Sequence, residues 1–321
     1  MKTAFISALG LYQYTRVPFG YRNAPQVFMR LIDKIITDAN LRSKVKAFVD
    51  DITAHGATWS AYLEAQREIL SALTASNWLV TVEKMYLGYQ SIELLGHLIE
   101  EGKIKPVPNK VEAINKLIPP SNTKQLKSFL GLVGFYRRFI KKFSNQAAPL
   151  VGLLQKNADY MWNKEHDHAF KQLKESLKQS TGLHLPSPQG RFRIYTDYSS
   201  AAISAILHQV QLQGDKEVEV PIAFSSRICR GKEKTLGSAE GELLAAVFAL
   251  TKYKQYVGQH PFDLITDSRA LCSLKSATNL AGKLARWSFF LEEFQINLIH
   301  KAGSTLQNAD GLSRCATAGD S

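Results

Sequence analysis

The chain has 321 residues, of which 45% are apolar and 21% charged, so it is long enough to bury a sizeable core and to form two or three domains. Its 40 Lys and Arg outnumber its 28 Asp and Glu, and the net charge of +12 favours a polyanionic partner such as nucleic acid. The three cysteines form no CxxC pair, which argues against a disulfide framework or a zinc site, and no apolar run suits a signal peptide or a membrane span.

The N-terminal part of the chain predicts a strand, two helices and a hairpin. Aromatic residues punctuated by prolines and a glycine over residues 10–28 predict a strand, a sharp turn and a helix over about residues 25–39. In VKAFVDDITAHG, β-branched and aromatic residues flank a carboxylate pair, which predicts a hairpin with Asp50 and Asp51 at its turn. Residues 60–78 show the apolar periodicity of an amphipathic helix.

The middle of the chain is strongly helical. The segment PPSNTKQLKSFLGLVGFYRRFIKKF begins with several N-cap residues after two prolines and predicts a helix with an apolar and a cationic side. Its apolar positions recur at helical spacing: Leu126, Phe129, Leu130, Val133 and Ile140. Another helix is predicted over residues 164–179, and LPSPQG at residues 185–190 predicts a linker that contains the main domain boundary.

Strands and helices are mixed beyond this linker. FRIYTDYS and EVPIAFSSRI predict two strands, and SAEGELLAAVFALTKYKQYV predicts the clearest helix of this half. DLITDS and FQINLIHKAG predict two further strands. The order indicates a mixed α and β domain without an internal repeat.

Four acidic residues of this half form an ordered set: Asp197, Glu242, Asp267 and Asp310. Asp197 and Asp267 each end an apolar β run, where an unpaired carboxylate is costly unless it meets a cation. Phosphodiester hydrolysis uses two hard divalent ions about 4 Å apart, and carboxylates from separate elements can hold such a pair. Any one acid among the 28 is more often a cap or a surface residue, so the hypothesis rests on the set.

The segments TDYSSAAISAIL, SAEGELLAAVFAL, LITDSRAL and HKAGSTLQNADGLSR, within about residues 186–315, resemble the successive motifs of retroelement ribonuclease H domains. The resemblance implies a catalytic set that binds two Mg²⁺ or Mn²⁺ ions: Asp197, Glu242, Asp267 and Asp310. Glu242 is preferred to Glu240 because it stands directly before the LLA helix. His300 stands ten residues before Asp310, the spacing at which some relatives keep a histidine that assists product or proton transfer; a structural histidine is the alternative.

FVDD at residues 48–51 resembles the aromatic-x-Asp-Asp motif of reverse transcriptases. With VPFGYRNAPQVF, LLGHLIEEGKIKP and FLGLVGFYRRFIKKFS, it appears in the order seen in gypsy-type LTR retrotransposon polymerases. The resemblance implies that Asp50 and Asp51 bind two polymerase metal ions and that Phe19 and Gly20 line the nucleotide pocket; a tight turn is the alternative role of this second pair. The third carboxylate of that site would precede KTAF, where this sequence begins, so we expect the 321-residue chain to polymerise poorly or not at all.

The implied fold mixes α+β and α/β architecture. It comprises a truncated right-hand polymerase palm, a helical thumb and connection, a ribonuclease H-like α/β domain with a mixed five-stranded sheet, and a tail, over residues 1–105, 106–184, 185–315 and 316–321. We expect six cations of the thumb to contact backbone phosphates: Lys124, Lys127, Arg137, Arg138, Lys141 and Lys142. A solvated helix face with its aromatic residues in the core is the alternative interpretation.

The leading functional hypothesis is an enzyme that hydrolyses RNA in RNA·DNA hybrids and carries incomplete motifs for RNA-directed DNA synthesis. The expected partners are an RNA·DNA hybrid and a primer-template, with a dNTP in the full-length relative and no membrane. The absence of targeting signals favours an intracellular location, in the cytoplasm or the nucleus. The alternatives are an inactive or domesticated retrotransposon remnant that only binds nucleic acid, and a structural module.

Overall fold

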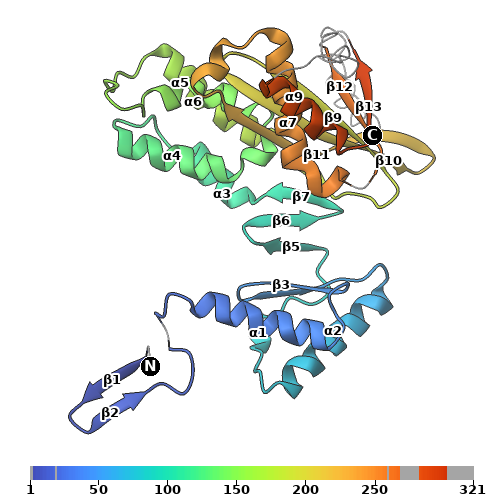
Figure 1. Ribbon diagram of the computed structural model, residues 1–321. Helices are drawn as coiled ribbons and strands as arrows, with labels where there is room; N and C mark the ends of the chain where they lie inside the picture. The colour runs from blue at the N-terminus through green and yellow to red at the C-terminus, as the bar shows by residue number, and fades with distance from the viewer. Residues whose placement is uncertain (1–2, 19, 259, 268–281, 302–321) are drawn as a thin grey trace, which may run out of the picture. The chain divides into compact units, whose positions relative to one another are not determined.

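The computed structural model divides the chain into two compact units, residues 1–87 and residues 88–321 (Figure 1). The residues that it describes are 3–18, 20–258, 260–267 and 282–301. Each unit has buried apolar clusters of its own. Among the described residues, no helix is long and apolar enough to cross a membrane.

The first unit contains two hairpins, two helices and a short 3₁₀ helix. Its elements are β1 (Ala4–Ser7), β2 (Gly10–Gln13), α1 (Ala24–Asp38), β3 (Val45–Phe48), β4 (Asp51–Ala54), α2 (Trp59–Ala75) and η1 (Val82–Lys84). Ile32 and Ile36 of α1 pack with Val45 of β3 and with Ile69 and Leu73 of α2. The predicted helices and the hairpin at the carboxylate pair are thereby confirmed.

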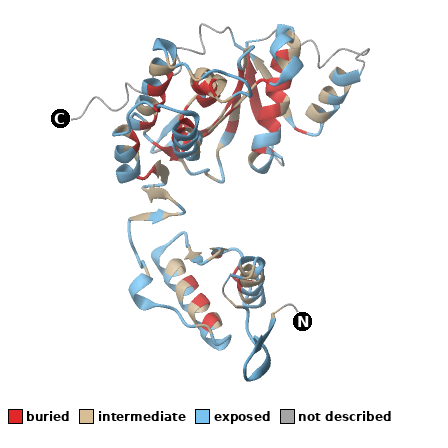
Figure 2. Ribbon diagram, turned by 90° about the vertical axis from the view of Figure 1, so that its left-hand side faces the viewer, coloured by how far each residue is buried: buried red, intermediate tan, exposed pale blue. Residues whose placement is uncertain are grey.

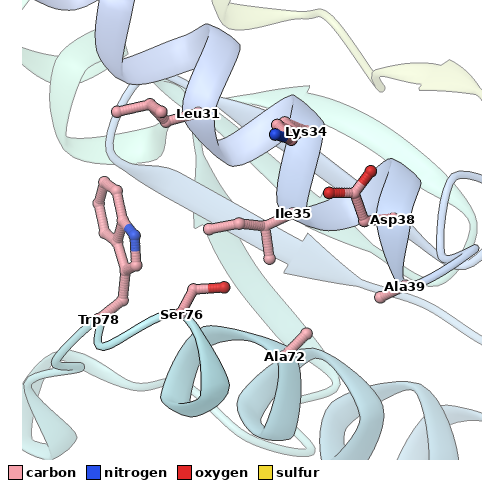
Figure 3. Close-up of a pocket in the computed structure, with 8 residues that line it drawn as sticks. All are labelled: Leu31, Lys34, Ile35, Asp38, Ala39, Ala72, Ser76 and Trp78. Atoms are coloured by element: carbon pink, nitrogen blue, oxygen red, sulfur yellow. The ribbon is translucent and has the colours of Figure 1, made fainter.

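Between α1 and α2 lies a groove of about 510 Å³ (Figure 3). Apolar, small and charged side chains line it: Leu31, Lys34, Ile35, Asp38, Ala39, Ala72, Ser76 and Trp78. The ring of Trp78 meets Phe28 edge-on, with 5.0 Å between the ring centroids. The groove is therefore bounded on one side by the aromatic edge of the unit's core.

The second unit begins with a small sheet and a group of helices. Its first elements are β5 (Ser91–Leu94), β6 (His97–Glu100), β7 (Lys103–Pro106), α3 (Pro108–Asn115), α4 (Thr123–Phe135), η2 (Arg137–Phe139), α5 (Phe143–Gly152), α6 (Lys164–Lys178) and β8 (Leu183–His184). The four strands form an antiparallel sheet in the order β5-β6-β7-β8. Leu126 and Phe129 of α4 share a buried cluster with Leu150 of α5 and with Phe170 and Leu173 of α6.

The long helix predicted from the segment PPSNTKQLKSFLGLVGFYRRFIKKF is wrong in its second half. Helix α4 is capped by Asn122 and ends at Phe135, and a 3₁₀ turn follows. Lys142 then has a left-handed backbone, with φ 52°, which no α-helix continues through. Phe139 and Ile140 lie in this broken segment and enter the buried cluster, at 3% and 1% exposure.

The rest of the second unit is a five-stranded mixed sheet with helices. Its elements are β9 (Arg191–Tyr198), β10 (Ala202–Gln213), β11 (Lys216–Ile228), η3 (Gly231–Thr235), α7 (Ser238–Val257), β12 (Phe262–Thr266), α9 (Gly282–Glu292) and β13 (Ile296–His300). The strand order is β11-β10-β9-β12-β13, with antiparallel pairing from β9 to β11 and parallel pairing of β12 with β9 and β13. The sheet expected for the C-terminal half is confirmed, and β10 is an additional strand that the sequence did not predict.

Helix α7 packs along the sheet, and Figure 2 shows the buried residues concentrated at this contact. Ile194 of β9, Leu207 of β10 and Leu264 of β12 are fully buried beside Ala249 of α7. The predicted linker at residues 185–190 is tied to the same sheet, because Gln209 bonds to the main chain of Ser187 and Gly190. Its irregular backbone is thus held by side-chain hydrogen bonds.

Candidate active site

The parallel pairing of β9 with β12 brings two of the predicted acids to one edge of the sheet. Ile265 lies opposite Tyr195 in this pairing. Asp197 stands two positions further along β9, and Asp267 directly follows the end of β12. Both acids therefore lie where two neighbouring parallel strands end, at the same edge of the sheet.

Glu242 joins this edge from the N-terminal part of α7. Its carboxylate oxygen Oε1 accepts a hydrogen bond of 3.2 Å from the main-chain N–H of Tyr198. The residue is only 6% exposed, and among the described residues no hydrogen-bond partner reaches its other oxygen, Oε2. Burial and the nearby Asp267 and Asp197 raise the pKa of Glu242 to about 7, against the opposing bond from Tyr198.

The approach of α7 to β9 depends on a glycine. At Gly241, an added Cβ would stand 2.1 Å from the Tyr198 ring, so only a residue without a side chain fits. The hydroxyl of Tyr198 in turn donates to the main-chain oxygen of Glu233 at 2.6 Å. Tyr198 and Gly241 therefore set the position of Glu242, and neither of them was predicted from the sequence. The available signal was that each adjoins a predicted acid.

A cation from outside the sheet reaches the acids. The amine Nζ of Lys142, at the start of α5, lies 2.7 Å from Oδ2 of Asp197, and both side chains are about half exposed, at 45% and 44%. Lys142 also acts on Glu242, since its charge opposes the rise in the pKa of that carboxyl group. The amine thus pairs with Asp197 and acts through its charge on Glu242.

Asp310 and His300 are the two other residues predicted for this site, and the structure describes only His300. Asp310 lies outside the described residues. His300 ends β13 and is exposed, and its Nε2 lies 3.1 Å from the main-chain oxygen of Asp267, a contact that requires the proton on Nε2. Within the described part of the chain, no three metal-ligating side chains stand close enough to hold an ion together.

In the first unit, Asp50 and Asp51 lie at the turn of the β3–β4 hairpin and are exposed. The residue before them, Val49, has a φ of 52°, which is rare for a β-branched residue and stores backbone strain. Its main-chain N–H points to Sδ of Met29, at 2.8 Å. The turn that carries the two acids is therefore in contact with α1 through Met29.

The predicted nucleotide-pocket residues lie before α1. Gly20 has a φ of 80°, a conformation that favours glycine, and it is exposed. Phe19 lies outside the described residues. The turn is closed by the main-chain N–H of Ala24, which donates to the oxygen of Tyr21 at 2.9 Å.

The six predicted phosphate contacts fall into different surroundings. Lys124 and Lys127 are exposed on α4. Arg137 donates to the main-chain oxygen of Ser226, and Arg138 stacks over the ring of Phe139 at 5.8 Å. Lys141 and Lys142 precede α5. Of these cations, the structure brings Lys142 to the carboxylates.

Comparisons with known proteins match both halves of the chain. Residues 3–99 match the family model described as reverse transcriptase (RNA-dependent DNA polymerase), and residues 187–294 match the RNase H-like domain found in reverse transcriptase. The chain is 32% identical to the retrovirus-related Pol polyproteins from transposons opus and 297 of Drosophila melanogaster, over 98% of its own length. It is 28% identical to the transposon Tf2-3 polyprotein of Schizosaccharomyces pombe. The chain spans 32%, 29% and 24% of these three relatives.

Solved structures share the fold. A foamy viral protease-reverse transcriptase in complex with double-stranded DNA has a TM-score of 0.77 at 21% identity, over 93% of this chain and 52% of that one. The protease-reverse transcriptase in complex with an RNA/DNA hybrid has a TM-score of 0.75 at 21% identity, over 94% of this chain and 41% of that one. The fold described above is therefore shared with these two structures.

Proposed function

Because the chain belongs to the reverse transcriptase and RNase H-like region of gypsy-type retrotransposon Pol polyproteins, we propose that its second unit hydrolyses RNA paired with DNA. The observation that supports the proposal is the burial of Glu242 with one unpaired carboxylate oxygen. This carboxylate stands against Asp197 and Asp267 at one edge of the sheet. A fold that needed no cation here would gain stability by losing this charge.

The donor set suits Mg²⁺ or Mn²⁺, since hard divalent cations prefer carboxylate oxygens. Asp197, Glu242 and Asp267 would hold such ions together with Asp310, which the sequence motif adds. When bound, a pair of divalent cations supplies activation of water and neutralises charge on the phosphate.

Other groups of the chain have supporting roles in the proposal. The main-chain N–H of Tyr198 orients Glu242 so that Oε2 is left for a ligand. Nε2 of His300 donates to the main-chain oxygen of Asp267, which leaves Nδ1 as the ring nitrogen available to a partner near the products. This is consistent with a role for His300 in proton transfer or product release.

We propose an RNA·DNA hybrid as the substrate. One of the solved relatives is in complex with an RNA/DNA hybrid, and the net charge of +12 favours a polyanion. Lys124 and Lys127 are exposed on α4 and suit contacts with backbone phosphates. Binding should then weaken as salt rises, with little dependence on sequence.

The first unit is proposed to belong to a polymerase centre for RNA-directed DNA synthesis. Asp50 and Asp51 would contribute carboxylates to its metal site, and Phe19 and Gly20 would lie at the nucleotide pocket. The support is the match to the reverse transcriptase family model over residues 3–99 and the strained turn that presents the two acids. The proposed organisation is a palm over residues 1–105, a thumb and connection over residues 106–184, and a nuclease over residues 185–315.

The nuclease is tested with a labelled RNA·DNA hybrid in the presence of Mg²⁺ or Mn²⁺. We expect the wild-type chain to cut the RNA strand of the hybrid and to leave single-stranded RNA intact. The Asp267→Asn variant should lose cleavage by a factor of about 100 or more, while it binds the hybrid as the wild type does. Equal cleavage by both proteins would contradict the proposal. Binding without cleavage by either would favour the remnant that only binds nucleic acid.

A further inference from the structure

Lys142 meets the acid cluster from a part of the chain that precedes the proposed nuclease region. It is the N-cap residue of α5 and has a left-handed backbone, with φ 52° and ψ 36°. Its amine lies 2.7 Å from Oδ2 of Asp197. An exposed ion pair alone contributes little to the free energy of folding. The position of Lys142 therefore depends on how its backbone is held.

The start of α5 is fixed to the five-stranded sheet by buried hydrogen bonds. The main-chain N–H of Ser144 donates to Oγ of Ser226 at 2.9 Å, and the two hydroxyl oxygens lie 3.1 Å apart. Both serines are buried, at 4% and 6% exposure. Oγ of Ser204 donates to Oδ1 of Asn145 at 3.0 Å, and Nδ2 of Asn145 donates to Oγ of Ser199 at 3.3 Å. Two neighbouring residues of α5, Ser144 and Asn145, are therefore both hydrogen-bonded to side chains of the sheet region.

These bonds stand within three residues of Lys142 along the chain. They set its Cα relative to β9, β10 and β11, so the side chain has only its own rotamers left to reach Asp197. The entropy lost when the ion pair forms is smaller for an anchored backbone than for a lysine on a loose loop. The backbone contacts of α5 thus hold Lys142 within reach of Asp197.

The acids need a counter-charge when no divalent cation is present. Asp197 and Asp267 lie near enough to Glu242 to act on its charge, and Glu242 is buried with a bare oxygen. The charges of Asp267 and Asp197 oppose ionisation of Glu242, which is only 6% exposed. The amine of Lys142 reduces that repulsion through Asp197.

We infer that Lys142 is a positioning residue of the nuclease site: a built-in counter-ion that holds Asp197 in the metal-free protein and releases it when a divalent cation binds. The inference rests on the proposed function, because it takes Asp197 as a metal ligand. Lys142 and the metal then compete for the same carboxylate. Lys142 stabilises the metal-free chain and weakens its affinity for cations.

The test uses Lys142→Met in the full chain, since methionine keeps the length of the side chain and removes the charge. Lys171→Met is the matched control, because Lys171 also pairs with an aspartate, Asp167 at 2.8 Å, on the exposed face of α6. Calorimetric titration with Mn²⁺ gives the affinity, and thermal unfolding in a chelator gives the stability of the metal-free protein.

We expect Lys142→Met to bind Mn²⁺ at least about threefold more tightly than the wild type, and to unfold at a lower temperature without metal. Lys171→Met should bind Mn²⁺ as the wild type does, and Lys142→Arg, which keeps the charge, should restore wild-type affinity within about twofold. An Lys142→Met affinity that is unchanged or weaker overturns the inference, as does an equal gain in Lys171→Met.

Failure of the inference can be told from failure of the proposed function. If the wild type cuts the hybrid and Lys142→Met binds Mn²⁺ no more tightly, only the counter-ion role falls. If Lys142→Met binds more tightly and no hybrid is cut, the counter-ion role stands and the hydrolysis falls. If Mn²⁺ binding is the same in the wild type and in Asp197→Asn, Asp197 is not a ligand and both proposals fall.

Discussion

Two carboxylates of the second unit, Glu242 and Glu219, are largely removed from water, yet their surroundings move their pKa values in opposite directions. Burial and two neighbouring aspartates raise the pKa of Glu242 to about 7. Burial acts the same way on Glu219, but hydrogen bonds from His208, Tyr195 and Arg193 outweigh it and lower the pKa of Glu219 to about 2. One group therefore opposes folding when it is ionised, and the other supports it.

The first prediction concerns Glu242→Gln in the metal-free protein. A raised pKa means that the ionised group costs stability above the unfolded value of about 4.5 and that the cost is complete above about 7. We expect the variant to be more stable than the wild type by about 2–3 kcal/mol at pH 8, and equal to it at pH 4. Urea unfolding in a chelator at both pH values measures this. A less stable variant at pH 8 would show that the carboxylate has a partner the structure does not describe.

The second prediction concerns Glu219→Gln. A lowered pKa means that the group contributes stability above about 4.5 and that the contribution is lost as the pH falls toward 2. At pH 7 we expect the variant to be less stable than the wild type by about 2–3 kcal/mol, a difference that shrinks at pH 3. Glu217→Gln, at an exposed position on the same strand, is the control and should change little. A pH-independent difference would mean that packing, and not charge, is lost.

The sequence identified Glu242 but not Glu219. Glu242 stands in a motif of recognisable order, so a resemblance was enough to select it. The surroundings of Glu219 come from β9 and β10, and the register that pairs β10 with β11, the strand of Glu219, shifts between Leu207 and His208. A shift of one residue turns every later side chain to the other face, and no pattern in the sequence marks where that shift occurs.

At the scale of elements, the predictions succeeded where periodicity is strong and failed where the chain turns to fill a core. The predictions of helices α1, α2, α6 and α7 are confirmed. Apolar spacing indicated α2, the prolines and glycine before it indicated α1, and dense Ala and Leu indicated α7. The helix through residues 136–142 was not correct: the local pattern suits a helix, but the chain forms a 3₁₀ turn and a left-handed residue at Lys142, where α5 begins its contact with β11. Strand β10 was missed because its alanines and glutamines have weak strand preference.

The third prediction compares two glycines within helices. Gly241→Ala places a Cβ against the Tyr198 ring and forces α7 away from β9, so we expect a loss of about 1–3 kcal/mol and a displaced Glu242. Gly131→Ala in α4 meets no atom within 4 Å and should gain about 0.5–1 kcal/mol, since alanine is the better helix former. Chemical denaturation of both variants measures the two signs. The same sign for both would mean that helix propensity alone decides.

At the scale of the whole molecule, the domain boundary predicted at residues 185–190 lies inside the second compact unit. The sequence shows a Pro- and Gly-containing stretch there, which is typical of a linker. Gln209 donates to the main-chain oxygens of Ser187 and Gly190 and so ties this stretch to β10. The serine pair of α5 and β11 joins the segments on its two sides. Such contacts connect residues far apart in the chain and leave no periodic trace in it.

The fourth prediction follows from this joining. A fragment of residues 88–321 should unfold as one cooperative unit. A fragment of residues 185–321 would expose Phe224 and leave the hydroxyl of Ser226 without Ser144, and we expect it to be less stable by about 3 kcal/mol or more. Calorimetry of the two fragments measures the difference. Equal melting temperatures would show that the nuclease region folds without the helices before it.

The parallel pairing of β9 with β12 also determines the order in which the residues of the site can fold together during translation. The antiparallel strands β9, β10 and β11 are consecutive, so they can pair and receive α5 before α7 and β12 have been synthesised. We expect Asp197 to meet Lys142 during translation, ahead of Glu242 and Asp267. Asp197 would then already be paired with Lys142 when Glu242 and Asp267 take their places beside it. The two later carboxylates would therefore meet less repulsion as the site folds.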